Sequence, residues 1–223
     1  SVSRLSNFIN NRTFSQKLFG SIYENNKLTA FKIYKNYIEH ISKILKKVGV
    51  NINTAPVLDI HYKNTHKVLD TRTYSSNKRT IKQLGAYCVK IYKNNKISTV
   101  IKHIPGHGLA KVDSHHFTPV VRKKKSYLIK NDFVPFKNKK TFFAMTAHII
   151  FNKIDPKNTV THSKKTVELI RNLIGFRNIL ISDDLSMKSL NGTIKENTIK
   201  MFEAGCNLAL HCNGNFKEME IVG

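Results

Sequence analysis

Apolar residues recur at helical spacing in several stretches of the chain, with short apolar runs between them. In residues 28–49 the apolar positions fall on one side of a helix, and Gly49 follows as a stop signal. These positions are Ile33, Tyr34, Tyr37, Ile38, Ile41, Ile44 and Leu45. Further helices are predicted over residues 79–95, 162–174 and 194–205, and a short one over residues 126–136.

Five β-prone runs alternate with these helices. The runs are NINTAPVLDI, STVIKHIPGHG, TFFAMTAHII, NILISDDLSM and NLALHC. Residues 60–76 and 104–123 are predicted as loops, so the second run passes into a loop rich in Gly and Pro. Helices that alternate with continuous apolar strands are typical of a parallel α/β sheet.

The spacing of the strands indicates a barrel. Eight strand–helix units at this spacing need about 300 residues, whereas the chain has 223 and begins with Ser rather than Met. We therefore expect an α/β fold, a (β/α)8 TIM-type barrel truncated to about five of its eight strands. Residues 1–223 would form one barrel domain that lacks its N-terminal strands and extreme C-terminus. An open five-stranded sheet is the alternative.

The composition is that of a globular protein, with 40% hydrophobic and 23% charged residues. It excludes collagen, coiled coil and wholesale disorder. We find neither an apolar run near the ~20 residues that span a bilayer nor a signal segment at the start, so we expect a cytoplasmic protein without a membrane partner. The three cysteines are too few and too irregularly spaced for a disulfide framework, which agrees with that location.

The net charge of +24 first suggests a nucleic-acid partner. However, only seven of the 38 basic residues are Arg, the residue that supplies bidentate base contacts. Lys, Asn and Ile are abundant together and share A/T-rich codons, so a biased genome explains the excess of Lys. We therefore expect no nucleic-acid partner, although a real anionic partner stays open.

Polar residues capable of chemistry follow the predicted strands. They are Asp59, His103, His148, Asp183 and Cys212. Because the active site of a strand–helix barrel lies at the carboxyl ends of its strands, we expect these residues to gather there.

The richest stretch is KHIPGHGLAKVDSHHFTP, residues 102–119. It could bind a metal, form a polar loop, or carry acid/base chemistry. Pro105 and Gly106 lie between His103 and His107, which argues against a helical metal-binding face, and we expect no metal. Asp113 stands two residues before His115 and could orient its imidazole as a proton donor.

Two further candidates have structural alternatives. Asp183 ends an apolar strand and could act as a nucleophile or electrostatic stabiliser. The alternative for Asp183 is a helix N-cap, and for Asp184 that cap is as good an interpretation as any other. Arg72 suits recognition of carboxylates or dense hydroxyls, but could also be an ordinary surface residue.

The loop resembles the pattern K-H-F-P-G-H-G-x-x-x-x-D-S-H-x-x-x-P, with Ile104 in place of Phe. With APVLDI, RTY, MTAHII, ILISDDLSM and EAGCNLALHCN, the chain resembles glycoside hydrolase family three over nearly its whole length. Within that family it resembles the bacterial cytosolic beta-N-acetylglucosaminidases (beta-hexosaminidases) of peptidoglycan recycling.

This resemblance implies a catalytic domain that removes terminal N-acetylglucosamine from muropeptides such as GlcNAc-anhydroMurNAc, with retention of configuration. It implies Asp183 as nucleophile, His115 as general acid/base and Asp113 as the partner of His115. The residues implied to bind the sugar are Arg4, Arg72, Lys102 and His103. Arg4 resembles the last Arg of a family segment whose remainder, including a sugar-binding Asp, is absent here. The resemblance implies no cofactor, and we expect a monomer.

Other functions stay open at this point. A different family-three glycosidase, such as a glucosidase, is disfavoured by the KH-x-PGHG…DSH loop. A basic binding protein without catalysis and an inactive remnant of the enzyme are the remaining alternatives.

Overall fold

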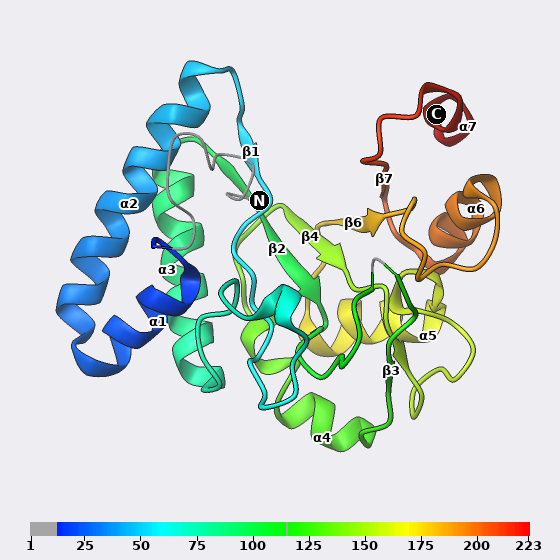
Figure 1. Cartoon of the computed structure of the whole chain (residues 1–223), viewed down its shortest axis with the longest axis horizontal. Coiled ribbons are helices and arrows are strands. Elements are labelled where there is room, and N and C mark those ends of the chain that lie inside the picture. Colours follow the sequence, from blue (N-terminus) through cyan, green and yellow to red (C-terminus); the bar gives the residue numbers. More distant parts are fainter. Residues whose placement is uncertain (1–12, 115) are drawn as a thin grey trace.

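The computed structural model describes residues 13–114 and 116–223 and contains a curled sheet of five parallel strands (Figure 1). The strands are β1 (Ile52–Asn53), β2 (Ser98–Ile104), β4 (Phe143–Thr146), β6 (Ile179–Asp184) and β7 (Leu208–Leu210). They pair in chain order, and every neighbouring pair is parallel. This arrangement is a half-barrel, and it confirms the predicted (β/α) barrel truncated to about five strands.

The strands are connected by helices. The helices are α1 (Gln16–Asn25), α2 (Lys27–Lys47), α3 (Lys78–Asn94), α4 (Lys125–Lys130), α5 (Lys164–Leu169), α6 (Ile194–Ala204) and α7 (Phe216–Val222). Short 3-10 turns are η2 (Lys67–Leu69), η3 (Val134–Phe136) and η4 (Val160–His162), and a π turn, η5 (Ile170–Ile174), extends α5. The patterns of residues 28–49, 79–95 and 194–205 thus correspond to α2, α3 and α6.

Local chemistry explains where several helices begin and end. The side chains of Ser15, Asn26 and Asn77 each accept a hydrogen bond from a backbone N–H of the first turn that follows. The Thr193 side chain likewise accepts a hydrogen bond from the N–H of Glu196 in α6. The carboxylate of Glu196 in turn accepts one from the backbone N–H of Thr193, which makes a capping box.

Two predicted strands are shorter than their apolar runs. The first run is strand only in β1, because Pro56 has no N–H to donate and only Val57 makes a further bridge, to Lys102. The third run divides into β4 and a separate β5 (Ile150–Phe151). β5 pairs in parallel with β3 (Val120–Val121), which lies inside the segment predicted as a loop.

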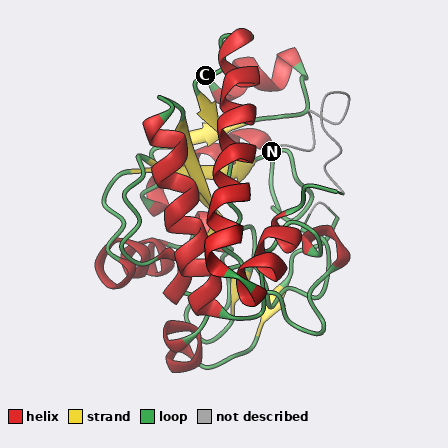
Figure 2. Ribbon diagram, turned by 90° about the vertical axis from the view of Figure 1, so that its left-hand side faces the viewer, coloured by secondary structure: helices red, strands yellow, loops and turns green. Residues whose placement is uncertain are grey.

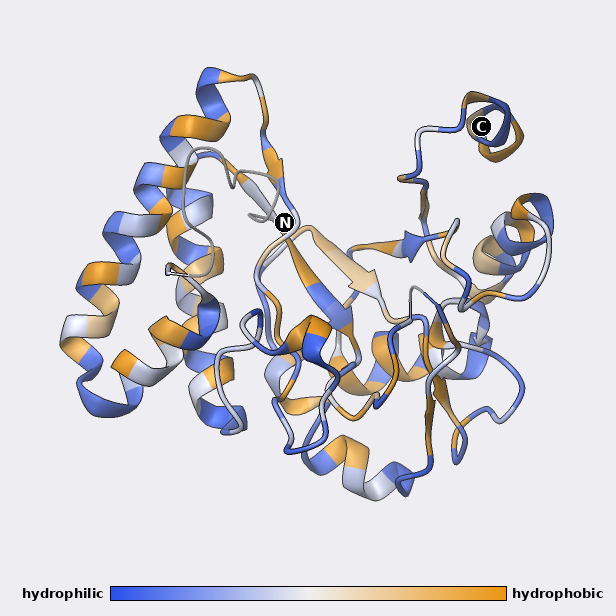
Figure 3. Cartoon of the chain, in the orientation of Figure 1, coloured by the Kyte–Doolittle hydropathy of each residue, from blue (hydrophilic) through white to orange (hydrophobic). Residues whose placement is uncertain are grey.

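The helices α1 to α3 pack against one another and cover one side of the sheet, as Figure 2 shows. Ile38 and Ile41 of α2 and Leu84 of α3 are fully buried between them. Figure 3 shows the apolar strands of the sheet and the alternating faces of α2. Ile33, which shares the predicted apolar spacing, is instead 40% exposed. Within the described part of the chain, no helix is both long and apolar enough to cross a membrane.

Candidate active site

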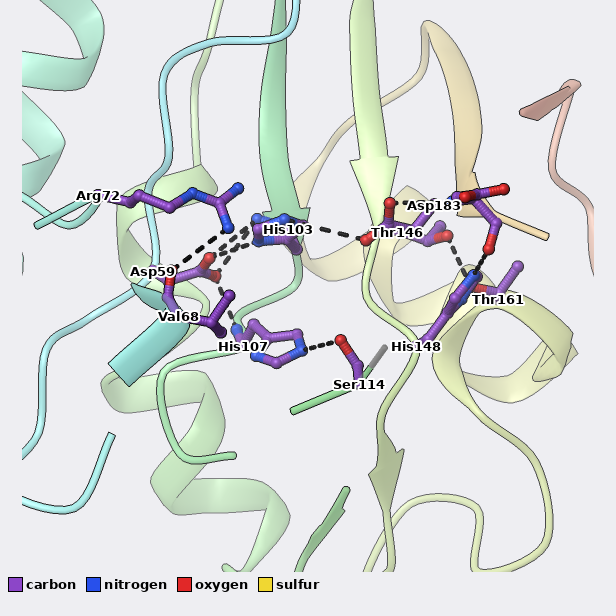
Figure 4. A network of polar contacts seen from close by, with 11 residues as sticks. Asp59, Val68, Arg72, His103, His107, Ser114, Thr146, His148, Thr161 and Asp183 are labelled. Atoms are coloured by element: carbon purple, nitrogen blue, oxygen red, sulfur yellow. Dashed lines mark hydrogen bonds and ion pairs between the residues drawn. The ribbon is translucent and has the colours of Figure 1, made fainter. Parts of the chain in front are cut away.

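The carboxyl ends of the strands bring together polar residues that lie far apart in the sequence (Figure 4). Asp59 follows β1, Lys102 and His103 lie on β2, His148 follows β4, and Asp183 lies near the end of β6. Parallel strands place their carboxyl ends at one edge of the sheet, so these side chains form one cluster.

An irregularity in β2 presents two successive residues to this cluster. Lys102 pairs with Met145 and Ile104 pairs with Thr146, so His103 is an extra residue in the ladder. Successive side chains of a regular strand point to opposite faces, but Lys102 and His103 are both buried, at 5% and 6% exposure.

Asp59 is fully buried and accepts hydrogen bonds from His103 of β2 and from His107 in the turn that follows. Its Oδ2 lies 2.7 Å from His103 Nδ1, and its Oδ1 accepts a 2.7 Å bond from the backbone N–H of His107. Burial alone would raise the pKa of Asp59, but His103 and His107 outweigh that effect and hold the pKa below its usual value. Asp59 is therefore a carboxylate, and the Nδ1 of His103 carries the hydrogen of their shared bond.

Asp183 lies on the other side of His103. Its Oδ2 is 3.9 Å from His103 Nε2, and its side chain is 18% exposed. Burial would raise the pKa of Asp183, but its electrostatic interactions with His103, His148 and Lys102 lower it, as does the hydrogen bond from the N–H of Asp184. The result is an ionised carboxylate in a partly enclosed site, which is the form that a nucleophile requires.

Asp184 has a different set of contacts from its neighbour. Its Oδ1 accepts hydrogen bonds from the backbone N–H and hydroxyl of Ser186 and from the N–H of Cys212. These bonds close the turn after β6 and join it to the end of β7. Asp184 therefore closes a turn and caps no helix, since the next helix, α6, is capped by Thr193, whereas Asp183 faces the polar cluster.

Lys102 is a buried cation of the cluster. Burial lowers the pKa of Lys102 to about 8, with Arg72 acting in the same direction and the carboxylates of Asp183 and Asp59 opposing it. Arg72 itself is half-buried and donates from Nη1 to the carbonyl of Val68 at 3.5 Å. Figure 4 shows the guanidinium of Arg72 beside His103, so three of the residues expected to bind the sugar lie together.

His148 joins the ends of β4 and β6 through contacts that the sequence pattern does not indicate. Its Nε2 donates to the carbonyl of Asp184 at 3.0 Å, and its Nδ1 lies 2.7 Å from the hydroxyl of Thr161. That hydroxyl also lies 2.8 Å from the hydroxyl of Thr146. Burial lowers the pKa of His148, which favours the neutral ring.

The loop after β2 is fastened to the same cluster. His107 is 3% exposed, and its Nε2 lies 3.2 Å from the hydroxyl of Ser114. Burial lowers the pKa of His107 to about 4, so the ring is neutral at pH 7. Ser114 follows Asp113, the predicted partner of His115.

The predicted acid/base and one predicted sugar ligand, His115 and Arg4, lie outside the described residues. Their roles therefore stay predictions. Among the residues that the structure describes, no three His, Cys, Asp or Glu side chains are grouped so that they could hold a metal ion.

Comparison with known proteins shows which family the chain belongs to. Residues 23–222 match the glycosyl hydrolase family 3 N-terminal domain. A beta-hexosaminidase of Bordetella avium is 26% identical over 204 residues, which are 89% of this chain and 58% of that protein.

Solved structures agree with the sequence match. NagZ from Neisseria gonorrhoeae, in complex with N-trifluoroacetyl-D-glucosamine, has a TM-score of 0.84 and 26% identity, covering 93% of this chain and 61% of that one. A family 3 beta-N-acetylglucosaminidase from a Paenibacillus species has a TM-score of 0.80 and 27% identity, covering 86% of this chain and 38% of that one.

The chain thus spans about three fifths of the beta-hexosaminidase and NagZ relatives described above. The family match extends over most of its residues and includes the strand ends that carry the polar cluster. The chain therefore belongs to glycosyl hydrolase family 3, of which it carries N-terminal domain sequence.

Proposed function

We propose that the whole protein is a retaining beta-N-acetylglucosaminidase, with Asp183 as its nucleophile. The observation that carries the proposal is the ionised Asp183 carboxylate, which lies among Lys102, His103 and His148 at the strand ends. The similarity to beta-hexosaminidases and to a beta-N-acetylglucosaminidase supports the choice of substrate.

In the first step, an oxygen of Asp183 attacks the anomeric carbon and the bond to the leaving-group oxygen breaks. His115, assisted by Asp113, gives its proton to that oxygen, and a covalent glycosyl-enzyme remains. In the second step, His115 takes a proton from water, the water oxygen bonds to the anomeric carbon, and the carboxylate is released. Two displacements restore the original configuration.

Arg4, Arg72, Lys102 and His103 are proposed to bind the hydroxyls of the terminal sugar. Charged donors form the stronger class of hydrogen bonds, and two of these four residues, Lys102 and His103, interact with Asp183. We further propose that the natural substrates are cell-wall fragments such as GlcNAc-anhydroMurNAc, and that the protein acts in peptidoglycan recycling in the cytoplasm as a monomer.

The test uses the full-length protein and two chromogenic sugars, an aryl beta-N-acetylglucosaminide and the matching aryl beta-glucoside. We expect hydrolysis of the first, with the product formed initially as the beta-anomer in proton NMR. Preference for the glucoside would indicate another family 3 specificity, and an alpha-anomer would exclude the double displacement.

Trapping the intermediate tests the assignment of Asp183. In His115→Ala, the second step loses its base, so the glycosyl-enzyme should accumulate on an aryl substrate. Intact-mass spectrometry should then show one added sugar residue, and peptide mapping should place it on Asp183. A sugar on any other residue would exclude Asp183 as the nucleophile.

A further inference from the structure

The buried carboxylate of Asp59 contacts His103, and the family resemblance assigns it no role. Three N–H groups point at it. Besides the contacts of His103 Nδ1 and His107 N at 2.7 Å, the backbone N–H of His103 lies 3.3 Å from both carboxylate oxygens. All three groups are donors, and an ionised carboxylate satisfies them because both of its oxygens accept.

We propose that Asp59 is a positioning residue that fixes the His103 ring with Nδ1–H toward Asp59 and Nε2 toward Asp183. The arrangement is a chain of three side chains, with Asp59 Oδ2 2.7 Å from one ring nitrogen and Asp183 Oδ2 3.9 Å from the other. Through its bond to the N–H of His107, Asp59 also holds the turn that leads into the loop of Asp113 and Ser114.

The geometry predicts the effect of Asp59→Asn without ambiguity. The backbone N–H of His107 can only donate, so the oxygen of the introduced amide must face it. The amide nitrogen then faces His103 Nδ1 and donates a hydrogen to it. The ring must therefore lose its hydrogen on Nδ1, which changes the hydrogen-bonding character or charge that it presents to Asp183.

The first experiment observes this hydrogen directly and does not depend on activity. Nitrogen-15 NMR of histidine-labelled full-length protein, assigned with His103→Gln, should show Nδ1 of His103 bearing hydrogen in the wild type and bare in Asp59→Asn. A bare Nδ1 in the wild type would overturn the inference, and this measurement requires no Asp59 variant to fold.

The second experiment measures kinetics and rests on the proposed function. We expect Asp59→Asn to lower kcat for an aryl beta-N-acetylglucosaminide by about 10²- to 10⁴-fold, since a histidine held in the wrong tautomer loses up to about 10⁴ in rate. The same substitution should change kcat little in a His103→Gln background, because Asp59 acts through His103. An equal loss in both backgrounds would show that Asp59 only supports the turn and would overturn the inference.

Asp155→Asn is the matched control. Asp155 is also a buried carboxylate, and it accepts hydrogen bonds from Ser163, Asn158 and the N–H of Lys157, none of which belongs to the polar cluster. We expect the control to leave both the His103 signal and kcat unchanged. If the wild-type protein shows the expected NMR signal but does not hydrolyse the aminosugar, the result contradicts the proposed function. The inferred orientation of the His103 ring would still be supported.

Discussion

Asp132 is a buried carboxyl in contact with the turn that follows β2, and it gives the stability of the fold a measurable dependence on pH. Its side chain is 2% exposed and accepts a 3.1 Å hydrogen bond from the hydroxyl of Tyr62. A Cβ added to Gly106 would lie 3.0 Å from the Cβ of Asp132, so the two segments are in close contact. Burial raises the pKa of Asp132 to about 7, and the bond from Tyr62 only partly offsets that effect.

The sign and size of the effect follow from this pKa. Between the unfolded value of 3.8 and the folded value of about 7, the folded protein binds more protons than the unfolded chain. The free energy of unfolding therefore falls as the pH rises through this range. Each pKa unit is worth about 1.36 kcal/mol, so the full loss is about 4 kcal/mol, of which about 3 kcal/mol lies between pH 4.5 and 8.

Asp132→Asn removes this titration and keeps an oxygen for the Tyr62 hydroxyl. We expect the variant to gain stability relative to the wild type as the pH rises, by about 3 kcal/mol between pH 4.5 and 8. Any constant effect of the amide cancels in that comparison. The measurement is urea unfolding at a series of pH values, followed by far-UV circular dichroism because the chain contains no Trp.

Asp155→Asn supplies a control whose stability difference from the wild type should change with pH in the opposite direction. The pKa of Asp155 is lowered, since the bonds from Ser163, Asn158 and Lys157 outweigh the effect of burial. Its stabilisation is present above its unfolded pKa and is lost as the pH falls, so the deficit of this variant should shrink in acid. A stability difference between Asp132→Asn and the wild type that stays flat from pH 4.5 to 8 would refute the reasoning.

Three further substitutions test the site and its support. Asp183→Ala should abolish turnover by several orders of magnitude and change the melting temperature little, whereas lost stability with retained activity would indicate a structural cap. His115→Ala should slow natural substrates more than aryl glycosides with good leaving groups, and Asp113→Asn should do so more mildly; equal losses would argue against His115 as the acid. Gly108→Ala places a Cβ 1.8 Å from the carbonyl oxygen of Ile60, so urea unfolding should show a loss of at least about 2 kcal/mol, and an unchanged midpoint would contradict that contact.

The sequence predicts the sheet and its main helices because their apolar patterns are strong and local. It does not predict α1, in which few residues are buried, or α7, in which none is. It also misses β3 and β5, which are two residues each and form only when distant segments meet.

Only part of the candidate site could be predicted, because some of its contacts also join segments far apart in the sequence. Strand ends and the family resemblance point to Lys102, His103 and Asp183. The contacts of Asp59 with His103 join residues 44 positions apart, and no local pattern reports such a contact. The raised pKa of Asp132 likewise depends on how deeply the folded chain buries it.

The chain-order pairing of the strands has a consequence for how the site can fail. Asp59, His103, His148 and Asp183 stand at the ends of four consecutive members of the sheet. A slip of one residue between any two of them would turn a strand's side chains to the opposite face. The polar cluster is thus assembled only when three separate pairings are all correct, so a misregistered chain could retain its helices and apolar core while the nucleophile points away from its cations.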